Sequence, residues 1–547
     1  MAAVSSQDDD DADADKSNDG SFESALNALF SPLHQSTTKE AIAKAAQRRT
    51  STVNDMRLYW SCLSDVPQKP NKRKMIHITG TKGKGSTACF CESIVRTHGC
   101  STGLFTSPHL IDIRERIRWN GRPVHGNIFS NAYWKIRRDL EASITKLENE
   151  DLPVLPGYFR MLTLMAYYIL EVMLEVDVLI IEVGMGGRYD ATNFWDVTDD
   201  SAVVCGVTKL DLDHTRILGN TVELIAWEKG GIFARDKADT VKISSKQVTR
   251  IEQESDETGA EKSASNYQPP GGAFLLDSNT PGVIAMFQSC AKIEGCGRLD
   301  LLLVDATGAR LVKALNGRPL GLAGEHQYGN ATLAVHLCQA VLPEDNISIE
   351  NPKTIEGVQS AQWPGRCQVL ERQPWTYLLD GAHTLDSMTA TVDFFSQQVK
   401  QNEECVLIFN CSHERNPIEL LRLLLPISIS KVYFAKSDSS RPSPVAVPNA
   451  KLLLQDQGIA IQSELLEEDE KPTWQETLAS VWKHLTAEWG SSTAISCNSS
   501  ARMVLDDLNA NYKPSKVLVT GSLYLVGSIL TTVEWTEESS PDIGNPL

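Results

Sequence analysis

One stretch near the start of the chain, residues 75–87 with the sequence MIHITGTKGKGST, restricts the fold more than any other. A short apolar run at Met75–Ile78 leads into a glycine-rich turn at Gly80–Gly85, and a segment of helical character follows from Ser86 to about His98. A strand, a glycine loop and a helix in this order can cradle phosphate. The glycines let backbone N–H groups point at the anion, and the helix dipole adds to the attraction. The sequence therefore predicts an α/β fold with a phosphate-binding loop.

The loop departs from the strict G-x-x-x-x-G-K-[ST] pattern at two positions. Ile78 stands where the pattern has glycine, and Gly85 stands where it has serine or threonine. A glycine-rich turn that binds nothing is the alternative. A basic Gly-Lys-Gly-Lys-Gly loop is costly to keep ordered without a ligand, which favours phosphate binding, with Lys84 as the lysine for the outer phosphates.

The composition is that of an ordinary globular protein and argues against several classes of partner. The chain has 547 residues, enough for two or more domains, and a net charge of −18. This charge disfavours a nucleic-acid surface or an anionic membrane partner. The twelve cysteines include no C-x-x-C pair, so we expect neither a zinc site nor disulfide staples, and a reducing compartment is the simpler expectation.

The sequence predicts neither a membrane span nor a targeting segment. The most apolar stretch, residues 161–183, is interrupted by four acidic residues and is expected to form a buried helix and strand. The N-terminus has no apolar signal core and is acidic where a mitochondrial presequence would be arginine-rich. We expect a cytoplasmic location, and an organelle-targeted isoform stays open.

The distribution of charge, glycine and proline predicts two folded domains and two irregular stretches. Residues 1–20 are acidic and nearly free of large apolar side chains, so a disordered tail is expected. Residues 236–280 are rich in Ser, Glu, Pro and Gly and are expected to be a surface insertion. The turn Trp363–Arg366 is a candidate junction. The predicted domains span residues 21–361 and 362–547.

Strand and helix signals alternate in both predicted domains, which is typical of a mainly parallel sheet with helices on both faces. The expected strands are Met75–Ile78, Asp177–Val183, Ala202–Val207, Tyr377–Leu379, Val406–Phe409, Lys431–Ala435 and Lys516–Thr520. The expected helices are Thr87–His98, Tyr158–Leu174, Val222–Lys229, Met388–Gln398, Glu419–Leu424 and Trp474–Glu488. We predict a P-loop-type α/β domain followed by a smaller, Rossmann-like α/β domain.

Two further positions suggest a metal site near the glycine loop. Glu182 ends an apolar run, VLIIE, and a carboxylate late in such a strand is costly to bury unless it binds a metal or a charge. At the carboxyl end of a parallel strand it would face the nucleotide crevice. Ser107, after another apolar run, could complete a Mg²⁺ shell, although a turn-capping serine is the alternative. The basic residues Arg114, Arg116 and Arg118 could bind an anionic substrate or form a solvated face.

Several weaker candidates follow along the chain. They comprise the pair Asp213-His214, Lys229 before a double glycine, Asn330 with nearby hydrogen-bonding groups, Arg366 at the junction, and Asp380 with His383 after a strand. An Asp in such a place could accept hydrogen bonds from ribose hydroxyls or merely cap a helix. A lone histidine is more often structural than a ligand, so none of these is specific on its own.

Taken together and in order, these segments resemble the Mur-ligase superfamily of ATP-dependent amide-forming enzymes, and within it the folylpolyglutamate synthases of eukaryotic type. The similarity spans about residues 56–530. It is carried by the strings HITGTKGKGSTACFCESIVRTHG, GLFTSPHLIDIRERIRWNGRPV, GYFRMLTLMAY, IIEVGMGGRYDATN, DHTRILGNTVELIAWEKGGIF, GEHQYGNA, WPGR, LDGAHTLDS and VLVTGSLYLVG.

The resemblance implies roles for individual residues. ATP would be bound by Gly80, Thr81, Lys82, Gly83, Lys84, Gly85, Ser86, Asn330, Arg366, Asp380 and His383. Mg²⁺ would be held by Ser107 and Glu182, with His214 and Lys229 near a second metal. Lys229 matches a lysine that is carbamylated in related enzymes. Lys84, His214 and Lys229 would be the catalytic residues, and the stretch Thr106–Arg118 would border the folate and metal sites.

The implied reaction attaches L-glutamate to the γ-carboxyl group of a folate or tetrahydrofolate through an acyl phosphate, in a monomer that needs no nucleic acid or membrane. Dihydrofolate synthase is the closest alternative, and a non-catalytic nucleotide-binding module or a simple P-loop kinase is less compatible with the full residue set. The chain departs from the family at Asp211, where glycine is common, and at Asn416 and Tyr524.

Overall fold

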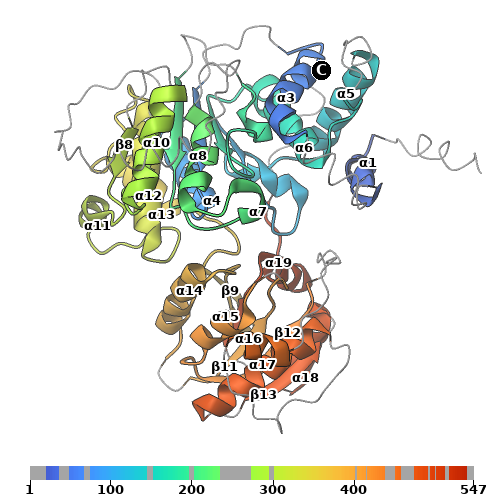
Figure 1. The fold of residues 1–547 in the computed structure, drawn as a ribbon, viewed down its shortest axis with the longest axis vertical. Coiled ribbons are helices and arrows are strands. Elements are labelled where there is room, and N and C mark those ends of the chain that lie inside the picture. Colours follow the sequence, from blue (N-terminus) through green and yellow to red (C-terminus); the bar gives the residue numbers. More distant parts are fainter. Residues whose placement is uncertain are drawn as a thin grey trace, which may run out of the picture.

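The computed structural model shows two α/β sheet domains, one above the other (Figure 1). It describes residues 20–35, 48–66, 74–143, 152–195, 202–233, 273–294, 301–400, 403–413, 415–437, 450–457, 473–490, 493–498, 500–511 and 516–538. The predicted disordered tail at 1–20 lies outside these ranges except for Gly20, as does most of the predicted insertion.

The N-terminal domain is built on a sheet of eight strands among the described residues, in the order β4-β3-β2-β5-β1-β6-β7-β8. All neighbours from β2 to β8 in this order are parallel, whereas β3 and β4 form an antiparallel edge. The strands are β1 (Lys74–Thr79), β2 (Thr102–Phe105), β3 (Ile117–Trp119), β4 (Arg122–Pro123), β5 (Val178–Glu182), β6 (Ala202–Val207), β7 (Ala273–Leu276) and β8 (Leu301–Val304).

Helices cover both faces of this sheet because successive strand residues point to opposite sides. Met75 packs into one apolar cluster, and Ile76 and Ile78 pack into another. The helices of this domain are α1 (Phe22–Gln35), α3 (Thr52–Ser61), α4 (Lys84–Thr97), α5 (Gly126–Ser143), α6 (Tyr158–Tyr167), α7 (Thr215–Leu218), α8 (Val222–Gly230), α10 (Pro281–Glu294), α11 (Ala309–Leu315), α12 (His326–Val341) and α13 (Pro352–Ser360). Short 3₁₀ or π turns lie at Arg49–Ser51, Ile113–Arg116, Tyr168–Met173, Ala191–Asn193 and Gly231–Phe233.

The C-terminal domain has a six-stranded sheet in the described residues, in the order β13-β12-β11-β14-β10-β9. It is parallel except for β9, which pairs antiparallel with β10. The strands are β9 (Gln368–Arg372), β10 (Trp375–Leu379), β11 (Cys405–Phe409), β12 (Ile429–Ala435), β13 (Ala494–Asn498) and β14 (Lys516–Thr520). The helices are α14 (Leu385–Gln398), α15 (Pro417–Leu424), α16 (Ala450–Asp456), α17 (Trp474–Trp489), α18 (Ala501–Asn511) and α19 (Leu523–Thr532).

The structure confirms the predicted fold class and every predicted strand within a few residues. One prediction is wrong in part. The stretch 236–280 was expected to be surface insertion, but Ala273–Leu276 forms β7, a buried strand paired with β6 and β8. The strand was missed because its apolar run, AFLL, has only four residues and follows two glycines in a polar stretch. A run of this length does not distinguish a strand from a loop.

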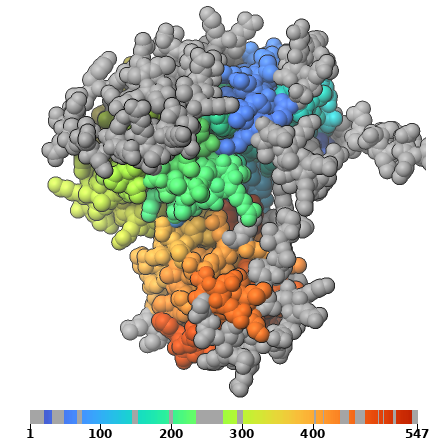
Figure 2. Space-filling model, viewed as in Figure 1, coloured from blue at the N-terminus to red at the C-terminus, as the bar shows by residue number. Residues whose placement is uncertain are grey.

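The two domains meet across a narrow waist, with α14 and α19 of the C-terminal domain facing the N-terminal one (Figures 1 and 2). The carboxyl ends of β1, β5 and β6 lead into the loops at this junction, where open α/β sheets bind ligands. Within the described part of the chain, no helix is both long enough and apolar enough to cross a bilayer.

Candidate active site

A cavity of about 1750 Å³ lies at the junction of the two domains and holds most of the predicted site residues. The predicted residues that line it are Thr81, Lys82, Gly83, Lys84, Gly85, Ser86, Ser107, Glu182, His214, Asn330, Arg366, Asp380 and His383. Gly80 and Lys229 adjoin it, since the Lys229 Nζ donates a 2.7 Å hydrogen bond to the Gly80 carbonyl. Candidates from both domains are therefore brought to one place.

The glycine loop, residues 80–86, turns from β1 into α4 through two glycines with positive φ. Gly80 has a φ of +145°, and a Cβ there would lie 1.9 Å from the Thr208 hydroxyl. Gly83 has a φ of +87° and is the N-cap of α4, and a Cβ there would lie 2.5 Å from Asn330 Oδ1. Both positions require glycine. The loop ends at the N-terminus of a 14-residue helix, where free N–H groups favour an anion.

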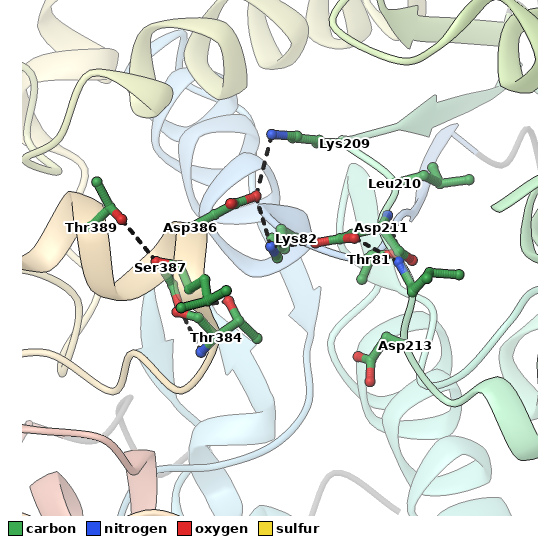
Figure 3. Close-up of polar contacts among 12 residues, drawn as sticks. Thr81, Lys82, Lys209, Leu210, Asp211, Asp213, Thr384, Asp386, Ser387 and Thr389 are labelled. Atoms are coloured by element: carbon green, nitrogen blue, oxygen red, sulfur yellow. Dashed lines mark hydrogen bonds and ion pairs between the residues drawn. The ribbon is translucent and has the colours of Figure 1, made fainter. Parts of the chain in front are cut away.

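The two lysines of this loop have different surroundings. The Lys84 Nζ lies 3.9 Å from Glu182 Oε1 and 3.5 Å from the Thr81 carbonyl, so its charge sits inside the cavity. The Lys82 Nζ instead contacts two carboxylates, Asp211 at 2.6 Å and Asp386 at 2.9 Å (Figure 3). Lys84 is thus the loop lysine whose ammonium faces the cavity without such a close carboxylate, while the Lys82 ammonium is engaged by acidic partners.

Glu182 lies where the sequence predicted it, at the end of β5, and its carboxylate is buried. Glu182 Oε2 accepts a 3.0 Å hydrogen bond from the Ser107 backbone N–H, and burial raises the pKa of the carboxyl group. The nearest ammonium, that of Lys84, only partly offsets this cost. A buried carboxylate whose charge is only partly compensated is a candidate for binding a cation.

The oxygen donors of Glu182 and Ser107 fit Mg²⁺ better than they fit a metal ion that needs a complete set of protein ligands. Mg²⁺ commonly binds through one or two carboxylates together with substrate phosphates and waters. Glu182, beside Ser107 and the glycine loop, provides such a partial site. Within the described ranges no cluster of three or more His, Cys, Asp or Glu side chains has the arrangement of a complete metal site.

Lys229 and His214 occupy different environments. Lys229 lies at the end of α8 with a buried side chain, and burial followed by the nearby Lys84 charge lowers its pKa to about 7. His214 begins α7 with a φ of +49°, and its half-exposed ring lies 3.7 Å from the Asp213 carboxylate. The structure brings both to the cavity region, but among the described residues it records no direct contact between them.

The C-terminal domain contributes Arg366, Asp380 and His383. The Asp380 carboxylate accepts hydrogen bonds from the Cys367 N–H at 2.7 Å, the Ala382 N–H at 2.8 Å and the Thr391 hydroxyl at 2.9 Å. Asp380 therefore anchors the turn after β10, which is close to the capping alternative suggested by the sequence. The Arg366 charge acts on Glu182 across the domain junction.

His383 and Asn330 are held by local hydrogen bonds. The His383 Nδ1 lies 2.9 Å from the Gly381 carbonyl, and burial lowers the pKa of its ring. The Asn330 amide donates to Gln327 Oε1 at 3.0 Å, and Gln327 in turn donates to the Ser86 hydroxyl at 3.3 Å. This chain of contacts ties α12 to the end of the glycine loop.

The three arginines grouped in the sequence, Arg114, Arg116 and Arg118, make different contacts. Arg114 pairs with Asp112 at 2.7 Å on the surface of the turn. Arg116 lines the cavity and its Nε donates to His109 Nδ1 at 2.9 Å. Arg118 is buried and pairs with Glu537 near the C-terminus. Arg118 also lines the cavity, but because its guanidinium is already paired with Glu537, Arg116 is the stronger candidate for an anionic substrate.

Part of the cavity lining was not singled out in the sequence. These residues include Arg49, Met185, Tyr189, Phe159, Arg160 and Ile217. They combine aromatic and apolar surface with two guanidinium groups, and Arg49 lies over the Tyr189 ring at 5.3 Å from its centre. The strings around Phe159 and Tyr189 were noted for their resemblance, but isolated aromatic residues carry no signal of their own.

The fold and this cavity together define a two-domain α/β protein with a glycine loop at the domain junction. No family model matches the chain. Folylpolyglutamate synthase of Arabidopsis thaliana is 33% identical to it, covering 94% of this chain and 88% of the plant protein. The mitochondrial folylpolyglutamate synthase of Homo sapiens is 35% identical over 394 residues, and the match spans 66% of this chain but only 59% of the human protein. The chain belongs to the folylpolyglutamate synthase family.

Solved structures share the fold over most of the chain. Mycobacterium tuberculosis folylpolyglutamate synthase complexed with ADP has a TM-score of 0.63 at 20% identity, covering 94% of this chain and all of that one. E. coli FolC in complex with DHPP and ADP has a TM-score of 0.58 at 22% identity, covering 88% and 92%. The family predicted from the sequence is confirmed by the curated relatives.

Proposed function

We propose that this chain is an ATP-dependent ligase that adds L-glutamate to the γ-carboxyl group of tetrahydrofolate and its polyglutamates, so retaining folates for one-carbon metabolism. One observation carries the proposal: the similarity to folylpolyglutamate synthases extends over 94% of the chain. The nucleotide candidates of both domains also line one cavity, which agrees with a reaction that uses both.

The proposed chemistry has two steps. A carboxylate is a poor electrophile, so a γ-carboxylate oxygen first attacks the γ-phosphorus of ATP, ADP leaves, and an acyl phosphate forms. The amine of the incoming glutamate then attacks the acyl carbon, phosphate leaves, and the nitrogen loses a proton. In phosphoryl transfer the protein contributes mainly positioning and charge neutralisation, so we assign no covalent protein nucleophile.

The chain's own residues have assigned parts in this scheme. The N–H groups at the start of α4 would hold the phosphates, and Lys84 would neutralise charge on the transferring group. Arg366 would add charge from the C-terminal domain when the nucleotide lies between the domains. Asn330 and His383 would line the nucleoside end. Asp380 would act by holding the turn that carries His383, because its carboxylate is already hydrogen-bonded within the domain.

Glu182 and Ser107 would hold Mg²⁺, with His214 and Lys229 near a second ion. When bound, the metal supplies further neutralisation of phosphate charge. The lowered pKa of Lys229, about 7, makes a neutral amine available near neutral pH, and this is the form that captures CO₂. This supports the proposal of a carbamylated Lys229, which mass spectrometry of the intact protein under CO₂ would test.

The proposal extends to the organisation of the protein. We propose a division into domains at residues 21–361 and 362–547, a monomer in solution, and a cytosolic location. Light scattering would test the monomer, and imaging of the tagged protein would test the location.

The decisive experiment supplies purified protein with ATP, Mg²⁺ and labelled glutamate, together with either tetrahydrofolate or dihydropteroate. We expect label to enter the tetrahydrofolate product. Label in the dihydropteroate product alone would replace the proposal with dihydrofolate synthase. No label in either product would leave a nucleotide-binding protein without ligase activity.

A further inference from the structure

Four charged side chains form one network at the contact between the glycine loop and α14 (Figure 3). The Lys82 Nζ lies 2.6 Å from Asp211 Oδ2 in its own domain and 2.9 Å from Asp386 Oδ2 in the other domain. The Lys209 Nζ lies 3.4 Å from the same oxygen of Asp386. Asp386 is thus the single carboxylate in this network that comes from the C-terminal domain.

The N-terminal side of the network is joined to the glycine loop by backbone contacts. The Thr81 and Lys82 N–H groups both donate to the Lys209 carbonyl, at 3.0 and 3.1 Å. The Thr81 hydroxyl donates to the Asp211 carbonyl and accepts from the Asp211 N–H, both at 3.1 Å. These hydrogen bonds fix the segment of Lys209 and Asp211 against the glycine loop. A displacement of Lys209 would therefore also displace the loop.

The C-terminal side is equally well held. Asp386 lies in the first turn of α14, which Thr384 and Ser387 cap reciprocally. The same helix follows directly on the turn that carries Asp380 and His383, and Thr391 of α14 donates to the Asp380 carboxylate. Holding Asp386 therefore also sets where these two nucleotide candidates stand relative to the glycine loop.

Two simpler explanations of these residues are incomplete. An Asp in a first helical turn stabilises the helix dipole, but this does not require the 2.9 Å contact with the other domain. A lysine in a glycine loop could contact phosphate, yet the Lys82 ammonium already has two carboxylate partners. Lys84 remains to face the cavity.

We propose that Asp386 is a positioning residue of the ligase reaction. By pairing with Lys82 and Lys209 it fixes the start of α14 on the glycine loop, and so holds the two halves of the nucleotide site together. The catalytic part of this inference rests on the proposed function, whereas the contact itself does not.

A zero-length carbodiimide cross-link tests the contact without any activity. It joins an ammonium to a carboxylate only when the two touch. We expect peptides linking residue 386 to residue 82 or 209, and we expect the Lys82–Asp211 link, formed within one domain, in the same digest as an internal control. The Lys82–Asp211 link without any link to residue 386 would overturn the proposal.

Steady-state kinetics test the positioning function. If nucleotide affinity depends on the fraction of molecules in which the domains are held together, Asp386→Asn should raise KM for ATP by about three- to fivefold. Asp386→Glu should recover most of the loss. Glu419→Gln removes an exposed carboxylate from α15 that, in the described structure, neither lines the cavity nor forms an ion pair, and it should change KM by less than about twofold.

The results separate the two proposals. A protein that forms the residue-386 cross-links but makes no folate product would refute the proposed function and leave the contact established. An active protein whose Asp386→Asn variant has the KM of the Glu419→Gln variant would refute the positioning function alone. Equal loss in the Asn and Glu variants would also refute it, because it would indicate a requirement for the Asp side chain in helix packing.

Discussion

Several ion pairs join the C-terminal domain to the N-terminal one in the described structure, and two of these contacts differ in almost every respect. Near the antiparallel edge of the first sheet, Arg118 binds Glu537 with both guanidinium nitrogens, at 2.6 and 2.8 Å. The Arg118 side chain is only 4% exposed and lies over Trp363, 4.9 Å from the ring centre. At the glycine loop, Lys82 shares its charge between two carboxylates, and Asp386 is 55% exposed.

Burial explains what each contact can do. A buried, bidentate pair is shielded from salt and cannot separate without leaving a charge in a poor solvent, so Arg118 and Glu537 act as an anchor. An exposed, shared pair competes with water and ions and contributes little to stability. Such a contact can open and re-form, which suits the side of the junction at which we propose that the nucleotide binds.

The largest effect is expected from the lysine of the glycine loop that takes part in neither contact. Lys84→Ala should lower kcat by about 10²- to 10³-fold or more, because a charge at the transferring phosphate is lost from a preorganised site. Single-turnover assays measure the loss, and circular dichroism should show an unchanged fold. A variant with most of its activity would remove Lys84 from the phosphate site and return Lys82 to consideration.

The anchor should matter most for stability. Arg118→Ala should lower the free energy of unfolding by about 3 kcal/mol, since it breaks a buried pair, although water can reach the Glu537 that remains. Urea unfolding measures this. Arg137→Ala, which breaks an exposed pair with Glu141 on one helix, should cost less than about 0.5 kcal/mol. Equal costs would contradict the distinction drawn between buried and exposed pairs.

Salt should act on the loop contact and spare the anchor. KM for ATP should rise between about 0.05 and about 0.5 M salt. The fold-rise should be about three times larger for the native chain than for Asp386→Asn, because salt can screen the loop contact only in a chain that forms it. The destabilisation caused by Arg118→Ala should stay nearly constant over the same range. Parallel salt slopes for the native chain and Asp386→Asn would argue that the loop contact does not form in solution.

The smallest effect is expected in acid. The hydrogen bond from Lys82 lowers the pKa of Asp386 below the usual value of 3.8. A carboxyl group whose folded pKa is depressed stabilises the fold fully above its unfolded pKa and loses this contribution as the pH falls through the folded value. The difference in the free energy of unfolding between the native chain and Asp386→Asn should therefore be about 0.5 kcal/mol or less, as for other exposed ion pairs, and constant from pH 5 to 8. Urea unfolding measures it. The difference should close below about pH 4, and a gap that grew in acid would reverse the assigned sign.

Much of the fold could be predicted because its signals are local. The apolar runs at Met75–Ile78 and Val178–Val183 are buried strands, and the alternating faces of β1 feed two separate cores. Several elements were missed, among them the 18-residue helix α5 and the short strands β7 and β8. β7 and β8 have four residues each, and too few residues alternate there to separate a strand from a loop.

Some residues of the candidate site could likewise be predicted from local sequence, and others could not. Glu182 and Lys84 could be named from the sequence, since a carboxylate at a strand end and a lysine in a glycine loop are unusual in their local context. Asp380 could not be assigned, because its partners, Cys367 N–H and the Thr391 hydroxyl, come from different turns. Asp211 was noted as a departure from the family pattern, and only its contact with Lys82 explains what it does.

The sequence alone determined the order of the candidate site segments along the chain: a glycine loop, a buried acid, a basic residue at α8 and a second α/β domain. Each of the first three is recognisable from a few neighbouring residues. The tertiary structure decided which charges meet. Lys82 and Asp386 are 304 residues apart in the chain, and Arg118 and Glu537 are 419 apart. No local pattern specifies such pairs, because a charged side chain looks the same in sequence whether the folded chain buries it against a partner or leaves it in water. Burial and geometry, which arise only when the two sheets pack, distinguish the anchor from the contact that can open.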